Sequence, residues 1–180
     1  MMSFGFGEQG YVCISIETRK EVGEEYSAIK GFFKQYELNY VVGDERDLVR
    51  LRTHVKDEDV YLYRLKAQPQ VVRNVFLDYF KHINRLTEKP KWYNALTHNC
   101  TTTIRGHALP HTENRPLDWR LIINGYLDKM LYERKDVDTS LPFAELKKQV
   151  YINEKAVKWD ESQDFSNYIR CGLPGMEETK

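Results

Sequence analysis

The sequence lacks an excess of charge of either sign. Its 180 residues include 27 basic and 27 acidic side chains, which give a formal net charge of zero with neutral histidines. The basic residues are scattered, and the longest basic runs hold only two of them. Binding to nucleic acid or to an anionic membrane surface is driven by a concentrated positive field. We therefore expect no nucleic-acid partner.

Long apolar runs are absent as well. No stretch reaches the ~18–20 apolar residues that a membrane-spanning helix requires, so none is predicted within this sequence. Internal repeats and low-complexity tracts are also absent. Apolar residues make up 41% of the chain and charged residues 30%, which is typical of a globular protein. The length predicts a single domain over residues 1–180.

Cysteine is scarce, and its spacing excludes a cysteine-based zinc site. The three cysteines, Cys13, Cys100 and Cys171, include no Cys-x-x-Cys pair, the spacing that structural zinc sites use. We expect no metal site and no cofactor. Because the number of cysteines is odd, at least one thiol stays unpaired within the chain. Cys13 lies in an apolar run, which favours a small core residue, and Cys171 is assigned no role.

Runs of apolar, β-favouring residues predict a strand-rich first third of the chain. We expect strands over residues 1–6, 11–17, 37–42, 48–52 and 60–65. The glycines of Gly7–Gly10 predict a tight hairpin between the first two strands.

Helical periodicity follows the strands. We expect helices over residues 69–87, 100–106, 117–123, 126–133 and 142–156, and one more turn over 164–170. Pro69 suits the first turn of the longest helix, and Ser140 is the predicted cap of the helix 142–156. Strands followed by helices predict an α+β fold.

Cys100 stands out because it lies at the start of a predicted helix. The unpaired N–H groups and the dipole at a helix N-terminus favour a thiolate, and the same N–H groups can bind an oxyanion. Asn99 can either cap this helix or donate a side-chain N–H to the oxyanion. The alternative is a free cysteine packed beneath the long helix, with Asn99 as an ordinary cap.

A nucleophilic cysteine requires a base, and no histidine is an obvious one. The five histidines are His54, His82, His98, His107 and His111. Two residues as close as His98 and Cys100 point at each other only in a special turn. His107 is about 10 Å from Cys100 along a helix, too far for a hydrogen bond. His82 is predicted on a solvated helix edge, whereas His54, after a predicted strand, and His111, in a loop, stay open as candidates.

A set of short motifs runs in order along nearly the whole chain: Ser3–Phe6, Ser15–Glu21, Phe33–Leu38, Asp44–Thr53, Asp59–Tyr63, Asn99–Thr102, Asp118–Arg120, Gly125–Tyr126 and Asp138–Phe143. Together these motifs resemble the Lnb N-terminal periplasmic domain family, a bacterial family long described as being of unknown function. The resemblance implies a periplasmic or other extracytoplasmic domain of the cell envelope. It also implies membrane attachment through segments absent from this sequence.

The resemblance further implies a fold and a chemistry. The family takes its name from a lipoprotein transacylase, and its fold looks similar to permuted papain-like enzymes of the NlpC and lecithin-retinol acyltransferase type, with an antiparallel sheet packed on helices. In those enzymes a histidine on an early strand serves an Asn-Cys pair at a helix start, and the acyl group passes through a thioester. This implies Cys100 and Asn99 as catalytic residues, with Glu17 or Ser15 orienting the imidazole. The alternative for Glu17 is a surface salt bridge with Arg19 or Lys20.

The sequence departs from the family where the base is expected. The family's histidine falls just upstream of the strand that matches Ser3–Phe6, and this sequence begins two residues before that strand. One explanation is that Met1 or Met2 is an internal methionine of a longer protein, and this is the explanation we expect. The other is that this member is inactive or uses His54 or His98 as its base.

Arg50 and Arg52 occupy alternate positions of the predicted strand 48–52, which places both on one face. They are candidates for binding a substrate phosphate or carboxylate. The alternative is ion pairing with Asp44, Glu45 or Asp47.

The sequence thus predicts a thiol acyltransferase or an amide or ester hydrolase that acts on lipid-linked or peptide substrates. Two alternatives stay open: a noncatalytic binding module with a papain-like cleft, and a cell-wall peptidase.

Overall fold

Two compact units make up the chain in the computed structural model, which describes residues 1–19, 36–93, 99–112, 116–122 and 125–176. Unit 1 consists of residues 1–2, 14–42 and 68–127, and unit 2 of residues 3–13, 43–67 and 128–180. Strands and helices are both present, which confirms the predicted α+β class.

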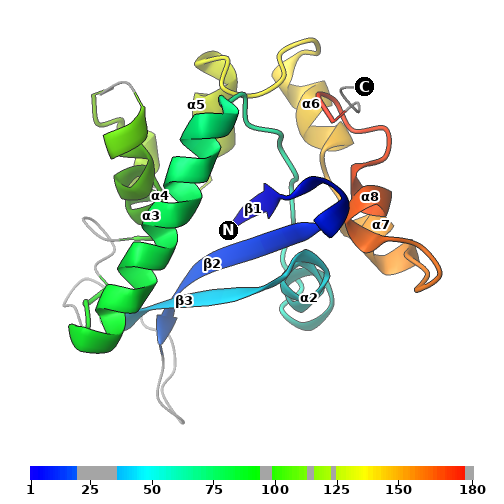
Figure 1. The fold of residues 1–180 in the computed structure, drawn as a ribbon. Helices are drawn as coiled ribbons and strands as arrows, with labels where there is room; N and C mark the ends of the chain where they lie inside the picture. The colour runs from blue at the N-terminus through cyan, green and yellow to red at the C-terminus, as the bar shows by residue number, and fades with distance from the viewer. Residues whose placement is uncertain (20–35, 94–98, 113–115, 123–124, 177–180) are drawn as a thin grey trace. The chain divides into compact units, whose positions relative to one another are not determined.

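An antiparallel sheet contains the first three strands, β1 (Met2–Gly5), β2 (Tyr11–Arg19) and β3 (Glu37–Asp44), in the order β1-β2-β3 (Figure 1). The predicted hairpin between β1 and β2 is confirmed. Its turn is closed by the Phe6 N–H, which donates to the Gly10 carbonyl at 2.9 Å. Four consecutive residues of the central strand β2, from Cys13 to Ile16, are buried. Since successive side chains point to opposite faces, β2 is covered on both faces at this point.

Two helices dominate unit 1. Helix α3 (Pro69–Glu88) confirms the longest predicted helix, with proline in its first turn, and helix α4 (Cys100–Ala108) packs against it. Figure 1 shows α4 running beside α3. Val75 and Tyr79 of α3 are buried. Where a helix was predicted over 117–123, the structure has a single 3₁₀ turn, Trp119–Leu121. The Asp118 carboxylate caps this turn by accepting the Arg120 N–H.

Short helices make up most of unit 2. They are α2 (Glu45–Arg50), α5 (Leu127–Glu133), α6 (Phe143–Gln149), α7 (Asn153–Lys158) and α8 (Phe165–Arg170). The main core lies around α7 and α8, where Ile152, Phe165 and Ile169 pack with Val49 and Val60. The predictions of a helix over 126–133 and of a helical turn over 164–170 are confirmed by α5 and α8.

The predicted strand 48–52 is wrong. Residues 45–50 form helix α2, and a π-helical turn, Leu51–Val55, continues it. The Asp44 side chain caps α2 by accepting the Arg46 N–H at 2.8 Å. Glu45, Leu48 and Val49 are the buried residues, and this spacing of three and four residues is that of one helix face. A capping aspartate followed by this spacing was the signal for a helix.

The predicted strand 60–65 and the predicted helix 142–156 are each only partly confirmed, for one shared reason. Tyr61 pairs with Tyr151 as an isolated antiparallel bridge, in which the Leu62 N–H donates to Val150 and the Ile152 N–H donates to Val60. This pairing at Tyr151 interrupts the predicted helix and divides it into α6, which ends at Gln149, and α7, which begins at Asn153. Ser140 does not cap α6, because its hydroxyl donates to Asp138 instead.

A buried ion pair joins α2 to α8. The Glu45 side chain is 1% exposed and accepts two hydrogen bonds from the Arg170 guanidinium, one of them at 2.7 Å. The guanidinium also stacks on the ring of Tyr11 at 3.6 Å. Two helices whose sequences lie far apart are therefore held at one buried point.

Candidate functional site

The N-terminus of α4 is locked by Asn99. Asn99 is 2% exposed, and its side-chain oxygen accepts the Thr102 N–H at 2.8 Å. Its backbone carbonyl accepts the Thr103 N–H at 2.9 Å. The predicted cap is confirmed, and it determines where the helix begins.

The side-chain nitrogen of Asn99 is also engaged. It donates to the carbonyls of Leu121 and Ile122 at 3.4 and 3.3 Å. The amide nitrogen therefore lies against the carbonyls at the end of the 3₁₀ turn that follows Asp118. The geometry confirms the cap, and the role of Asn99 as an oxyanion donor stays a prediction.

Cys100 is the first residue of α4, and its side chain is partly exposed. Its Sγ lies 3.8 Å from the Thr101 Oγ1. The cap uses the N–H of Thr102, so the N–H groups of Cys100 and Thr101 are the first-turn donors with no intrahelical acceptor. A thiol and two such donors at one helix start can attack a carbonyl carbon and bind the oxyanion that forms.

No imidazole contacts Cys100 within the part of the chain that the structure describes. His98 lies in the segment 94–98, outside the described residues. His54 belongs to unit 2, where its Nδ1 lies 2.7 Å from the Thr53 Oγ1. His54 and His98 as bases therefore stay predictions.

Glu17 and Ser15 lie on one face of β2. The Ser15 hydroxyl donates to the Glu17 carboxylate at 2.9 Å. Arg19, one predicted partner of Glu17, instead pairs with Glu37 at 3.2 Å, and Lys20 lies outside the described residues. The role of Glu17 in orienting an imidazole stays a prediction.

Arg50 and Arg52 do not share a strand face, because both lie in the helical segment after Asp44. The Arg50 guanidinium lies 5.8 Å from the centre of the Trp159 ring, and Arg52 pairs with Glu58 at 2.8 Å. The predicted shared face was wrong for the same reason as the predicted strand. At about 100° per residue, side chains two apart on a helix point in different directions.

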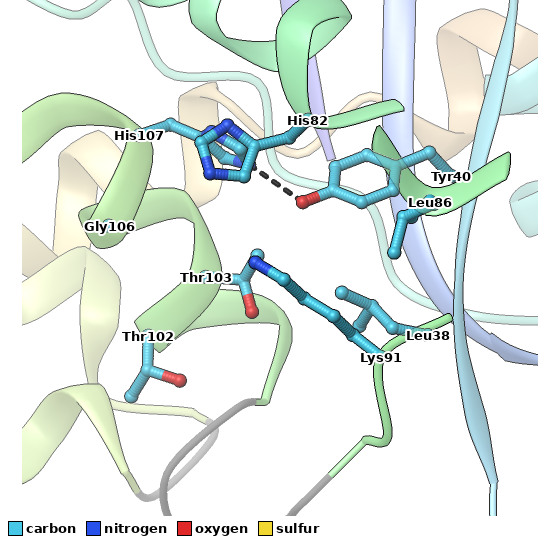
Figure 2. Close-up of a pocket in the computed structure, with 9 residues that line it drawn as sticks. All are labelled: Leu38, Tyr40, His82, Leu86, Lys91, Thr102, Thr103, Gly106 and His107. Carbon is cyan, nitrogen blue, oxygen red and sulfur yellow. Dashed lines mark hydrogen bonds between the residues drawn. The ribbon is translucent and has the colours of Figure 1, made fainter. Parts of the chain in front are cut away.

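A second cluster of titratable groups lies in unit 1, between α3, α4 and β3. The His107 Nδ1 lies 2.8 Å from the Asp78 Oδ2. Its Nε2 lies 2.7 Å from the Tyr40 hydroxyl, the contact that Figure 2 marks with a dashed line. The His82 Nδ1 lies 3.2 Å from the same Asp78 oxygen. The His107 ring is buried and stacks on Tyr79 with 4.0 Å between ring centres.

Burial controls the protonation of this cluster. It lowers the pKa of the His107 imidazole below its usual range and outweighs the hydrogen bond and negative charge of Asp78, which raise that pKa. Burial likewise raises the pKa of the Tyr40 hydroxyl above its usual range, and Asp78 adds to the effect. Near neutral pH the cluster therefore holds a neutral imidazole and a neutral phenol.

A pocket of about 220 Å³ opens beside the cluster. Tyr40, His82 and His107 form one side of it, and Thr102 and Thr103 of the first turn of α4 form another. Figure 2 shows the Lys91 side chain extending along the pocket toward Thr103. The Thr103 hydroxyl is buried and has no hydrogen-bond partner among the described residues. The pocket thus begins one helical turn from Cys100.

Sequence reasoning missed this cluster. His82 was expected on a solvated edge, but its side chain is only 29% exposed and lies against Asp78. The signal was the spacing of four residues between Asp78 and His82, which places both side chains on one helix face. Nothing in the sequence indicated that His107, 29 residues further on than Asp78, approaches the same point.

The fold and site define an α+β domain with a thiol at a capped helix start. The chain belongs to the Lnb N-terminal periplasmic domain family, whose sequence pattern matches residues 1–125. The matched segment contains both Cys100 and the Asp78–His107 cluster. Membership in this family places the domain outside the cytoplasm.

No curated protein and no solved structure matches the chain. None of the described helices has both the length and the apolar character needed to cross a bilayer.

Proposed function

We propose that Cys100 is the nucleophile of a thiol acyltransferase, or of an amide or ester hydrolase, that acts on lipid-linked or peptide substrates of the cell envelope. The observation that carries this proposal is a partly exposed thiol at the first position of a nine-residue helix whose start is locked by the buried Asn99. A permuted papain-like arrangement of sheet and helix is part of the proposal.

The reaction proceeds through a thioester. The Cys100 thiolate attacks the substrate carbonyl carbon and forms a C–S bond, while the N–H groups of Cys100 and Thr101 stabilise the oxyanion. The bond from that carbon to the leaving oxygen or nitrogen then breaks, and the leaving group takes up the proton lost by the thiol. An amine or water attacks the thioester in turn, which transfers or hydrolyses the acyl group and returns the thiol.

Acylation by a short-chain p-nitrophenyl ester tests the proposal. We expect one acyl group, removable by hydroxylamine, to appear on Cys100 and to be absent from Cys100→Ser. Cys171 is the matched control within the chain, because its side chain is more exposed than that of Cys100. If folded protein shows no adduct at Cys100, or if Cys171 is acylated at least as fast, the proposal is wrong.

A noncatalytic binding module is the second candidate. It is favoured by the finding that, among the residues that the structure describes, Cys100 contacts no base. This candidate predicts that Cys100→Ser leaves the function in cells intact, whereas the thioester mechanism predicts its loss.

A further inference from the structure

Three potential metal ligands converge in the cluster between α3 and α4. One donor atom from each of Asp78, His82 and His107 lies within 4.8 Å of the other two. Asp78 and His82 lie one turn apart on the same face of α3, and His107 approaches from α4. Both imidazole Nδ1 atoms approach the same carboxylate oxygen, at 2.8 and 3.2 Å.

These spacings are close to those of a zinc site. Ligands bound tetrahedrally at about 2.0–2.1 Å from Zn²⁺ are separated from one another by about 3.3 Å. The two measured separations are shorter by only a few tenths of an ångström, and all three donor atoms lie within 4.8 Å of one another. The His82 Nδ1 also donates to the Asp78 backbone carbonyl at 3.0 Å, and an ion bound at Nδ1 replaces the proton of this hydrogen bond. Two imidazole nitrogens and one carboxylate oxygen are a donor set that suits zinc and neighbouring divalent transition metals.

Tyr40 provides the support that a metal-bound histidine requires. A ligating imidazole donates its other N–H to a fixed acceptor, which sets the orientation of the ring. The Tyr40 hydroxyl lies 2.7 Å from the His107 Nε2 and can accept this N–H when Nδ1 binds an ion. Without an ion, the hydroxyl donates to Nε2 and the Nδ1–H donates to Asp78. The hydrogen bonds of His107 are therefore satisfied in both states.

The cluster is accessible from one side. His107 is 2% exposed, whereas the side chains of Asp78 and His82 are 16% and 29% exposed. His82 and His107 also line the pocket beside the cluster, so water or a ligand can reach the remaining positions around an ion. The positive charge of the Lys91 ammonium acts on the His107 imidazole and would repel a bound cation. We therefore expect the site to bind a metal ion with moderate affinity.

We propose that Asp78, His82 and His107 form a binding site for one divalent transition-metal ion of the zinc type, with Tyr40 as the residue that positions His107. The proposal is independent of the thiol chemistry proposed for Cys100. The competing explanation is a hydrogen-bonded network that joins α3 to α4 and binds no ion.

Titration of the whole metal-free chain with zinc chloride, in competition with a chromogenic chelator, tests the site. We expect one equivalent to bind. Asp78→Asn, which keeps the shape of the side chain, and His82→Ala, which removes a partly exposed ring, should each abolish this binding. Tyr40→Phe should raise the Kd about 10-fold to 100-fold, as loss of an outer-shell partner does.

His54→Ala is the matched control, because it removes a histidine of unit 2 and should leave the Kd unchanged. Cys100→Ser tests the thiol, since zinc also binds free thiolates, and it should likewise leave the Kd unchanged. The cobalt-loaded protein should show no thiolate-to-cobalt charge-transfer band. The proposal is overturned if no equivalent binds, if folded Asp78→Asn or His82→Ala binds as the unmodified protein does, or if binding is lost in Cys100→Ser.

Discussion

At the scale of single residues, the Asn99 side chain makes hydrogen bonds to two separate parts of the site. Its amide oxygen holds the first turn of α4, and its amide nitrogen holds the carbonyls of Leu121 and Ile122. One buried side chain thus places the thiol of Cys100 and ties it to a segment more than 20 residues away.

Two substitutions separate these functions of Asn99. Asn99→Ala removes both sets of bonds and should lower the free energy of unfolding by about 1–3 kcal/mol, because it removes a cap and leaves buried carbonyls unpaired. Asn99→Asp keeps a capping oxygen but cannot donate to Leu121 and Ile122. Urea unfolding measures the stability, and the rate of ester labelling at Cys100 measures the effect on the thiol.

We expect slower labelling in both variants, and Asn99→Asp should retain more helix at α4 than Asn99→Ala. Thr112→Ala is a suitable control, because it removes a side-chain hydrogen bond at an exposed position of the same unit. Unchanged labelling in a destabilised Asn99→Ala would show that Asn99 supports the fold but not the thiol.

The other two cysteines show how burial separates one thiol from another. Cys13 is 1% exposed, and burial raises the pKa of its thiol to about 11, which keeps it protonated at neutral pH. This confirms the prediction of a core residue. Cys171 is exposed at the end of α8. The three thiols therefore differ in solvent exposure: Cys13 is buried, Cys100 is partly exposed and Cys171 is exposed.

At the scale of elements, the buried ion pair between Glu45 and Arg170 links α2 to α8. Burial by itself raises the pKa of the Glu45 carboxyl, but the hydrogen bonds and charge of Arg170 outweigh it, and the pKa is lowered below its usual value. A carboxyl whose pKa is lower in the folded state stabilises the fold above its unfolded pKa. That contribution is lost as the pH falls through the folded pKa.

Unfolding of the protein and of Glu45→Gln as a function of pH tests this pair. At pH 7 the substitution should cost about 3–5 kcal/mol, since it leaves the buried guanidinium of Arg170 without a countercharge. The difference between the two proteins should stay constant down to about pH 5 and shrink below about pH 4.5, because the carboxyl of the unfolded chain binds a proton there while the folded one, with its lower pKa, is still ionised. Glu154→Gln, which removes an exposed ion pair, should change the stability by less than about 0.5 kcal/mol. A difference that does not depend on pH would contradict the assignment.

Local signals predicted some elements and failed for others. The long run of helical spacing in α3, the glycines of the first hairpin and the cap at Asn99 act over one to four residues, so they could be predicted. The segment 48–52 is too short for its apolar pattern to distinguish a strand from a helix, and the signal that decides between them is the capping residue Asp44. The break between α6 and α7 depends on pairing with Tyr61, some 90 residues away in the sequence, which no local pattern encodes.

At the scale of the whole molecule, balanced charge leads to a prediction about partners. The 27 basic and 27 acidic residues give a net charge of zero, so we expect no strong overall positive field. We expect the protein to pass through a heparin column at about 0.15 M salt without retention, whereas a basic protein of similar size is retained. Retention that weakens as salt is added would contradict the prediction that nucleic acid is not a partner.

The sequence by itself determined the α+β class, the family, the longest helix and the placement of Cys100 at a capped helix start. These features depend on composition, on short-range periodicity or on motifs that remain adjacent in the chain. Only the tertiary structure brought Asp78, His82 and His107 together and paired Glu45 with Arg170. Such contacts join residues that are 25 to 125 positions apart, and they form because packing of helices and strands buries polar groups that must then find partners.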